Sequence, residues 1–305
     1  MRRYLLRRTV ASVATLLAVS LVIFLAARVT GDPRTHLLAE NASREQYEEL
    51  GRILGLDQPL HVQYAVFLRQ LAQGDLGRSI SQNRATLPVI LERMPATLVL
   101  AAVAFTFAIA VGCTLGVLAA VRKGGPFDGA IQIVALTGQA IPAFWLGIML
   151  ILVFSVGLRW LPPSGQREWS SFILPSLALG WFFVAANLRL MRSSMLDVLG
   201  TEYIKMARAK GLPWRTVILK HAVRNALIPP LTFAGVMLGS MVTGSLVIET
   251  VFAWPGLGQL AVQAVFASDY PLLQGVVITF TALYMAAALL VDVLYAYLDP
   301  RVRYA

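Results

Sequence analysis

Residues 201–232 read TEYIKMARAKGLPWRTVILKHAVRNALIPPLT, a basic segment that lies between two long apolar runs. Thr201 is a good N-cap residue, because its side-chain oxygen can accept a hydrogen bond from the first turn of a helix. Gly211 stands where helices commonly end in a left-handed residue, and a proline follows two positions later. The pattern predicts a helix over residues 202–210, a stop at Gly211 and a second helix from about Trp214. The competing interpretation is a solvated basic loop.

The composition is that of an integral membrane protein. Hydrophobic residues make up 57% of the chain and charged residues 14%, and the mean hydropathy is +0.69. The net charge of +10 would indicate nucleic-acid binding if it formed a basic face on a soluble module. Many of the Lys and Arg residues instead flank apolar runs, where they set orientation in a membrane. The single cysteine, Cys113, excludes an intrachain disulfide and a cysteine-based metal site.

Six apolar runs are long enough to cross a hydrocarbon core about 30 Å thick. They are residues 9–29, 96–121, 130–157, 172–191, 227–248 and 272–298. The four arginines within residues 1–8 and the basic segment 192–224 predict a cytoplasmic side, whereas residues 249–271 contain no Lys or Arg. A cleavable signal peptide is the alternative for the first run, but its length favours a retained helix. Both termini are therefore predicted to be cytoplasmic.

These runs predict an all-α membrane protein with four parts. Residues 1–30 form the N-terminal end and first span, and residues 31–95, which are of ordinary soluble type, form a small extracytoplasmic subdomain. Residues 96–298 form a five-helix core that includes a cytoplasmic loop at 192–226, and residues 299–305 are a cytoplasmic tail.

Catalytic and nucleotide-binding motifs are missing from the sequence. No lysine is followed by Ser or Thr, so the phosphate-binding loop G-x-x-x-x-G-K-[ST] does not occur. The histidines lack the H-E-x-x-H spacing of a zinc hydrolase, and there is no G-x-S-x-G elbow. We therefore predict a non-catalytic subunit without a metal or cofactor of its own. If ATP is its energy source, another polypeptide binds the ATP.

Two groups of residues are candidates for handling a solute. Polar positions within the spans predict a weakly polar translocation path, although packing between helices also explains them: Gln139, Asn187, Ser240, Thr243 and Ser245. In the segment 249–271 a W-P-G-L-G turn precedes a short amphipathic helix, and aromatic residues can anchor it at the membrane interface. This segment is predicted either to seal the bundle or to act as an outer gate and docking site, through Trp254, Pro255, Gly256, Asp269 and Tyr270.

Several motifs together resemble those of one known family. EYIKMARAKGL and HAVRNALIPPLT resemble the cytoplasmic coupling loop of bacterial ABC-importer permeases, in the form typical of the peptide and nickel branch. Agreement extends along nearly the whole chain, through LGLDQPLHVQY, GDLGRS, RMPATL, IPAFWLG, ETVFAWPGLGQL and DYPLLQGVV. The chain is thereby identified as similar to the B-type permease subunits of dipeptide and oligopeptide importers, whose type I fold has six transmembrane helices.

The resemblance implies a multi-pass protein of the bacterial inner membrane that imports peptides by alternating access. Its implied partners are a second homologous permease, two ATPase subunits that bind ATP and Mg, and an extracytoplasmic solute-binding protein. Carried over by position, the residues that contact the ATPase are Glu202, Tyr203, Ala207, Arg208, Ala209, Gly211 and Leu212. The family pattern begins Glu-Ala-Ala, whereas Tyr203 follows Glu202 here. The alternative function is a stand-alone channel or ion-coupled carrier. Dipeptides, longer peptides, glutathione, nickel complexes and haem are all compatible solutes.

Overall fold

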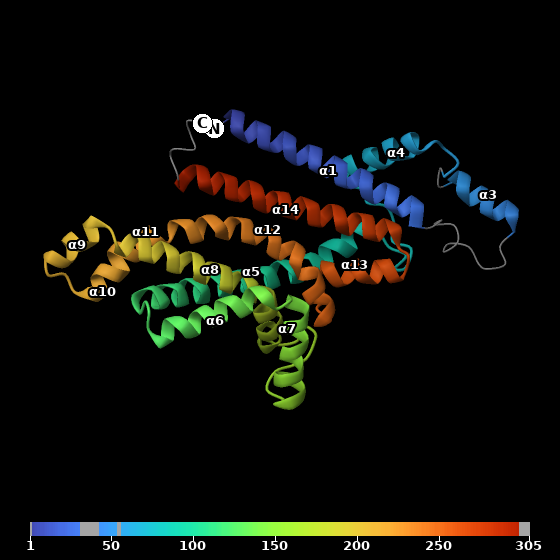
Figure 1. The fold of residues 1–305 in the computed structure, drawn as a ribbon. Helices are drawn as coiled ribbons and strands as arrows, with labels where there is room; N and C mark the ends of the chain where they lie inside the picture. Colours follow the sequence, from blue (N-terminus) through green and yellow to red (C-terminus); the bar gives the residue numbers. More distant parts are fainter. Residues whose placement is uncertain (1, 31–42, 54–55, 299–305) are drawn as a thin grey trace. The chain divides into compact units, whose positions relative to one another are not determined.

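The computed structural model describes residues 2–30, 43–53 and 56–298, and within these ranges the chain is helical with no strand (Figure 1). The backbone contacts divide it into two compact units. The first comprises residues 1–97 and 255–289, and the second comprises residues 98–254 and 290–305. The predicted tail at 299–305 and part of the predicted extracytoplasmic subdomain, 31–42, lie outside the described residues.

The first unit is built from long apolar helices and a short polar region between them. Its elements are α1 (Arg2–Thr30), α3 (Arg44–Ile53), α4 (Leu60–Ala72), the first part of α5 (Thr86–Val121), α13 (Leu257–Phe266) and most of α14 (Tyr270–Leu298). Between α4 and α5 a tight turn is closed by a backbone bridge between Arg78 and Ala85. α3 and α4 both fall within residues 31–95, the predicted extracytoplasmic subdomain.

The second unit is organised around α8. Its further elements are α6 (Pro126–Ala140), α7 (Ala143–Leu150), the π-helix η1 (Ile151–Gly157), the 3-10 turn η2 (Trp169–Phe172), α8 (Ile173–Leu199), α9 (Glu202–Ala209), α10 (Trp214–Thr216), the π-helix η3 (Val217–Ala222), α11 (Val223–Ala226) and α12 (Ile228–Val251). α8 packs against α6, α7, α11 and α12. It is the most buried of the apolar spans.

Glycines bring α5 unusually close to α8. A Cβ atom placed on Gly112 would lie 2.8 Å from Cβ of Asn187, and one on Gly116 would lie 2.7 Å from the carbonyl oxygen of Leu188. Real Cβ atoms do not approach their neighbours so closely, so a larger residue at either position would force the helices apart. Small residues commonly permit such close helix contact in membranes.

The third predicted span, residues 130–157, is wrong as a single helix. The chain bends by 110° between α6 and the following pair, α7 and η1 (Figure 1). The break falls at Ile141, which is extended (φ −87°, ψ 122°), and at Pro142, the N-cap residue of α7. Proline disfavours helical geometry in the residue before it and cannot donate the next backbone hydrogen bond.

The other predicted spans are confirmed as continuous helices with shifted ends. Among the residues that the structure describes, five helices are long and apolar enough to cross a membrane, and the bent pair makes six if it counts as one span. α5 begins at Thr86, before the predicted start at Ala96, and passes through Pro95 without a break. α8 continues to Leu199, past the predicted end at Met191. The division into a subdomain and a five-helix core stays a prediction.

Candidate functional site

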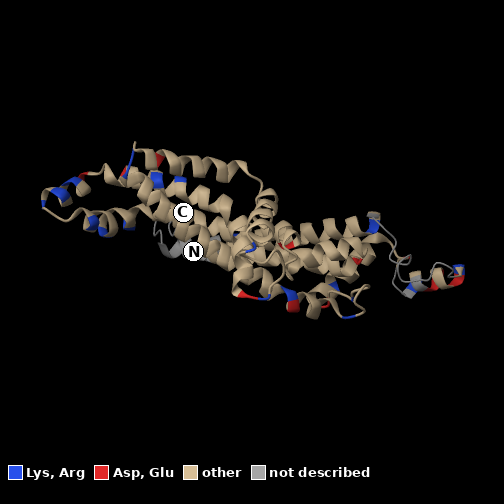
Figure 2. Cartoon of the chain, turned by 90° about the horizontal axis from the view of Figure 1, so that it is seen from below, with Lys and Arg blue, Asp and Glu red and all other residues tan. Residues whose placement is uncertain are grey.

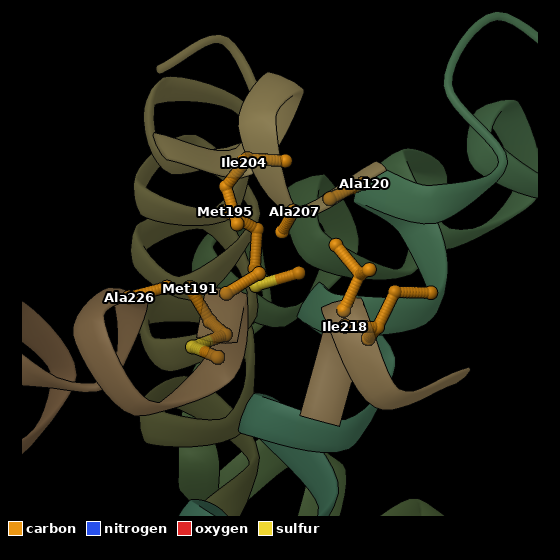
Figure 3. Close-up of a cluster of buried hydrophobic side chains, with 9 residues drawn as sticks. Ala120, Met191, Met195, Ile204, Ala207, Ile218 and Ala226 are labelled. Carbon is orange, nitrogen blue, oxygen red and sulfur yellow. The ribbon is translucent and has the colours of Figure 1, made fainter. Parts of the chain in front are cut away.

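α9 is held by its own chain along one face. Ile204 and Ala207 point into a cluster of buried apolar side chains that includes Met191 and Met195 of α8 and Ile218 of η3 (Figure 3). Such a short helix is marginal alone, and this contact supplies the packing that stabilises it. This contact joins α9 to the last turns of α8.

The predicted stop at Gly211 is confirmed. Gly211 has a φ of +74°, its N–H donates to the carbonyl oxygen of Arg208 (2.9 Å), and the N–H of Leu212 donates to the carbonyl oxygen of Ala207 (3.4 Å). These two bonds form a Schellman motif. A Cβ atom on Gly211 would meet nothing within 4 Å, so glycine is favoured by the backbone conformation and not by lack of space. The second helix begins at Trp214, as predicted.

The outward face of α9 is exposed and is fixed by side-chain contacts. The guanidinium carbon of Arg208 lies 4.0 Å from the ring centre of Trp214, a cation–π contact that spans the Gly211 turn. Asn225 Nδ2 donates to the hydroxyl of Tyr203 (2.7 Å). Met206, which lies between Tyr203 and Arg208 in the sequence, is 63% exposed. Figure 2 shows Lys and Arg positions gathered along the α9–α10 loop, which also bears the exposed Tyr203 and Met206.

Two expectations for this loop need correction. Ala207 is buried against its own chain, so it contributes to packing and does not offer surface to a partner. Thr201 stands at the N-cap position, but its hydroxyl donates back to the carbonyl oxygen of Val198 (2.6 Å) and makes no capping bond. The other predicted coupling residues are exposed together on this turn: Glu202, Tyr203, Arg208, Ala209, Gly211 and Leu212.

The structure does not bring the five predicted path residues together. Thr243 lies on the exposed face of α12, with Ser240 partly exposed one turn before it, and each hydroxyl donates to a carbonyl of its own helix. Ser245 is fully buried and donates to Glu249 Oε1 (2.9 Å). Gln139 is half-buried near the end of α6.

Asn187 is the fifth predicted path residue and is fully buried in α8. Its Nδ2 donates to the carbonyl oxygen of Phe183 (3.2 Å) and lies 2.9 Å from Sδ of Met237 on α12. Its Oδ1 has no hydrogen-bond partner within the part of the chain that the structure describes. Asn187 therefore joins α8 to α12 and does not line an open surface.

Residues 249–271, here called the α13 segment, are more deeply buried than expected. Trp254 is 0% exposed and packs edge-on against Phe172 with ring centres 4.6 Å apart, so its predicted role as an interface anchor is wrong. Gly256 is buried as the N-cap of α13, and the N–H of Leu257 donates to Thr97 Oγ1 (2.8 Å). Pro255 and Tyr270 are partly exposed.

Asp269 is a buried carboxylate that fastens the turn between α4 and α5. Its Oδ2 accepts from Ser79 Oγ (2.5 Å), Ser81 N (2.9 Å) and Ser81 Oγ (2.7 Å), and its Oδ1 accepts from Leu272 N (3.2 Å). Burial acts to raise the pKa of Asp269, but the hydrogen bonds from Ser79 and Ser81 outweigh it and hold the pKa below its usual range. This arrangement joins the GDLGRS and DYPLL motifs, which are far apart in sequence.

The residues that the structure describes include no group of three His, Cys, Asp or Glu side chains that could hold a metal ion. Within the second unit, the candidate coupling site thus consists of an exposed basic turn and a buried helix contact behind it.

Comparison with known proteins identifies the family. Residues 112–304 match the family described as "Binding-protein-dependent transport system inner membrane component". Residues 1–101 match the family described as "Binding-prot-dependent transport system membrane comp, N-term". The chain belongs to this family of transport permeases.

The permease is similar over its full length to proteins named glutathione transport system permease protein GsiC. It is 40% identical to the protein of Salmonella choleraesuis and 39% identical to that of Escherichia coli K12, with 100% of each chain covered. Among solved structures, the inward-facing methionine ABC transporter MetNI matches 69% of the permease and 96% of its own chain, with a TM-score of 0.58 and 19% identity. That likeness shows the fold alone.

These findings confirm the main sequence predictions. The permease is an ABC-importer subunit of the peptide and nickel branch, with an all-helical type I fold. It is a multi-pass protein of the inner membrane, and its relatives are transport components and not enzymes. The alternative of a stand-alone channel or ion-coupled carrier is not favoured.

One buried ion pair of the permease could not be predicted from the sequence. Asp128, in the first turn of α6, accepts from Arg192 of α8 through two bonds of 2.8 Å, one from Nε and one from Nη2. Gly124 N and Gln132 Nε2 also donate to this carboxylate. Bidentate pairs of this kind fix geometry as well as supply energy. The pair attaches α6 to α8, but the two residues are 64 positions apart and no local pattern joins them.

Proposed function

We propose that this permease imports small peptides across the inner membrane by alternating access, driven by ATP that separate subunits bind with Mg. The names of its full-length relatives support a peptide-like solute, because glutathione is a tripeptide. Its proposed partners are a second homologous permease, two ATPase subunits and an extracytoplasmic solute-binding protein. The termini are proposed to be cytoplasmic, in agreement with the basic residues of the α9 loop.

The main support for this proposal is that α9 has one exposed face and one face that packs against the rest of the chain. One face presents Tyr203, Met206 and the Arg208–Trp214 stack, and the other face packs on α8. Coupling between two sites requires an element whose contacts differ between two states. ATPase closure would move α9, and α8 would carry that movement to α6, α7 and α12, against which it packs.

We propose that the solute passes along the exposed face of α12, past Ser240 and Thr243. Both hydroxyls already bond to helix carbonyls, so they offer a weakly polar surface that does not hold a peptide tightly. The second permease would complete this path. Gln139, Asn187 and Ser245 would contribute only if α6, α8 or α12 moved, and Pro255, Gly256, Asp269 and Tyr270 would act as a support for the outer gate.

The coupling claim is tested by placing charge on the exposed turn. Met206→Asp should leave the fold intact because Met206 is exposed, and Gly211→Asp should add only the modest strain of a left-handed backbone in open space, yet both should strongly reduce peptide uptake and peptide-stimulated ATPase activity of the assembled importer. Leu60→Asp, at an exposed position of α4, is the matched control and should behave as wild type. Normal uptake in both α9 variants would exclude this turn as the coupling element.

A further inference from the structure

A second exposed turn of the second unit resembles the α9 turn. This α5–α6 turn, residues 122–127, begins where α5 ends and includes the first residues of α6. We propose that it is a second contact with the ATPase subunit that binds α9. The proposal rests on the coupling function given above, but it concerns residues outside the coupling loop that the sequence predicts.

The α5–α6 turn repeats the cation–π contact of the α9 turn. The guanidinium carbon of Arg122 lies 4.7 Å from the ring centre of Phe127, as that of Arg208 lies 4.0 Å from Trp214. Between Arg122 and Phe127 stands Gly124, which has a φ of +80° like the left-handed glycine of the α9 turn. A Cβ atom on Gly124 would meet nothing within 4 Å, and Phe127 is 38% exposed. Both turns therefore present a cation stacked on a partly exposed ring.

The two turns lie at the same end of the second unit (Figure 1). Ala120, in the last turn of α5, belongs to the same buried cluster as Ile204 and Ala207 of α9 (Figure 3). The α5–α6 turn begins two residues after Ala120, and two residues of chain span at most about 7 Å. A protein that covers the exposed face of α9 therefore has this turn within reach.

The α5–α6 turn is held in place from behind. Gly124 N donates to Oδ2 of Asp128 (3.0 Å), and the same carboxylate accepts two bonds of 2.8 Å from Arg192 of α8. Arg192 follows Met191, one of the α8 residues in the cluster that contacts α9. Both turns are thus attached to the same part of α8. A surface fixed in advance loses less entropy when it binds a partner.

The α9 turn alone is small for a stable protein contact. A standard interface buries about 800 Å² on each partner and involves about 20–30 residues a side. The α9 turn, residues 202–214, spans fewer residues than this, and Ile204 and Ala207 within it are buried against their own chain. An ATPase subunit that binds α9 therefore needs further surface beside it, which the α5–α6 turn supplies.

The charge of the α5–α6 turn indicates an acidic partner surface. Arg122 and Lys123 are exposed. Asp128 is the one carboxylate within residues 120–130, and its side chain is 3% exposed and bound to Arg192. The exposed part of the turn therefore bears positive charge without a carboxylate of its own, which complements acidic groups on the ATPase. An anionic lipid headgroup also suits this charge, and the experiment separates the two.

The test is photo-crosslinking within the assembled importer in nanodiscs. Lys123→p-benzoylphenylalanine should form an adduct with the ATPase subunit, identified by mass spectrometry, as should Met206→p-benzoylphenylalanine on α9. Both positions are exposed, so the fold tolerates the larger side chain. Trp169→p-benzoylphenylalanine is the matched control, because Trp169 is 79% exposed just before α8, whereas α9 follows the other end of that helix, about 40 Å away. It should form no ATPase adduct.

Charge reversal gives an independent measurement. Lys123→Glu should weaken binding of the purified ATPase subunit to the reconstituted permease about threefold to tenfold at low salt. The loss should shrink at high salt, because exposed charges are screened. Arg167→Glu makes the same charge change at an exposed position before α8, and its affinity should stay within about twofold of wild type.

The possible outcomes separate this inference from the proposed function. An ATPase adduct at Met206 but not at Lys123 would overturn the second contact and leave coupling through α9 intact, whereas no ATPase adduct at either position would overturn both. Adducts at Lys123 with lipid alone, or with the second permease alone, would assign the turn to that partner instead. If the Lys123 photoprobe variant did not assemble, the titration would decide, and equal affinities of Lys123→Glu and Arg167→Glu would overturn the proposal.

Discussion

The α9 turn and the α13 segment use the same backbone device for opposite purposes. Gly211 follows α9 as a left-handed stop, and Ser268 follows α13 in the same way, with a positive φ (49°) and the same two bonds: Ser268 N to Val265 O (3.1 Å) and Asp269 N to Ala264 O (2.8 Å). Beyond the stop, the α9 turn presents exposed residues, whereas the α13 segment continues into the buried Asp269. A shared motif therefore does not indicate a shared role. The roles of the two turns differ because the side chains that flank Gly211 are exposed, whereas Asp269, which follows Ser268, is buried.

The largest expected difference concerns the two tryptophans. Trp254→Ala should lower the free energy of unfolding by about 3–5 kcal/mol, because it empties a fully buried site beside Phe172. Trp214→Ala, on the exposed α9 turn, should cost about 1 kcal/mol or less and instead reduce uptake, since it removes the ring beneath Arg208. Thermal unfolding in nanodiscs and uptake by the assembled importer measure the two effects. If Trp254→Ala and Trp214→Ala lowered stability equally, the contrast between a buried α13 segment and an exposed α9 turn would be wrong.

Asp269→Asn should have the next largest effect on stability. The change leaves the shape nearly intact but removes the charge that accepts from Ser79 and Ser81, and a hydrogen bond to a charged group is worth about 1.5–3 kcal/mol. Asp75→Asn is the control, because that exposed carboxylate accepts one bond from Gly77 N. Unfolding of the two variants under one set of conditions tests this, and a variant as stable as the Asp75 control would contradict it.

The pH dependence of stability should follow from the same carboxylate. The pKa of Asp269 is lowered in the folded protein, so its contribution is fully present above the unfolded pKa of about 3.9 and is lost as pH falls through the folded pKa. Wild type should therefore lose more stability than Asp269→Asn between about pH 6 and pH 3. Parallel pH profiles for the two proteins would show that Asp269 is not responsible.

The smallest expected changes in the free energy of unfolding are at two residues with positive φ, Gly211 and Ala253, and they should have opposite signs. Gly211→Ala should cost about 0.5–1 kcal/mol, because left-handed strain exceeds the entropy saved in the unfolded chain. Ala253→Gly, which relieves a φ of 45° at the end of α12, should gain about 0.5 kcal/mol by the same balance. Denaturant midpoints measure both, and a gain from Gly211→Ala would contradict the assignment.

The sequence predicted the local features well, because they depend on residues near one another. The stop at Gly211 and the start at Trp214 follow from glycine and proline chemistry alone. The break at Pro142 could not be predicted from the proline alone. Pro95 lies inside a continuous helix, which shows that a proline in an apolar run does not distinguish a bent span from a straight one.

Long-range contacts account for what could not be predicted. Trp254 looks like an interface anchor until Phe172 is placed against it, and Asp269 looks like part of a surface loop until Ser79 and Ser81 bind it. Ala207 shares the small size of Ala209, and only the position of α8 makes it a packing residue. These partners are distant in sequence, so no periodicity or capping signal indicates them.

The 110° bend between α6 and α7 makes the second of these helices a lever. α7 and η1 together extend roughly 20 Å from the bend, at about 1.5 Å per residue. A rotation of α6 by about 10° around its own axis would then sweep the far end of η1 through roughly 3 Å, whereas the side chains that line α6 itself would move less. Because Asp128 attaches α6 to α8, a small turn of α8 that rotated α6 would displace the tip of η1 by more than it displaces α6.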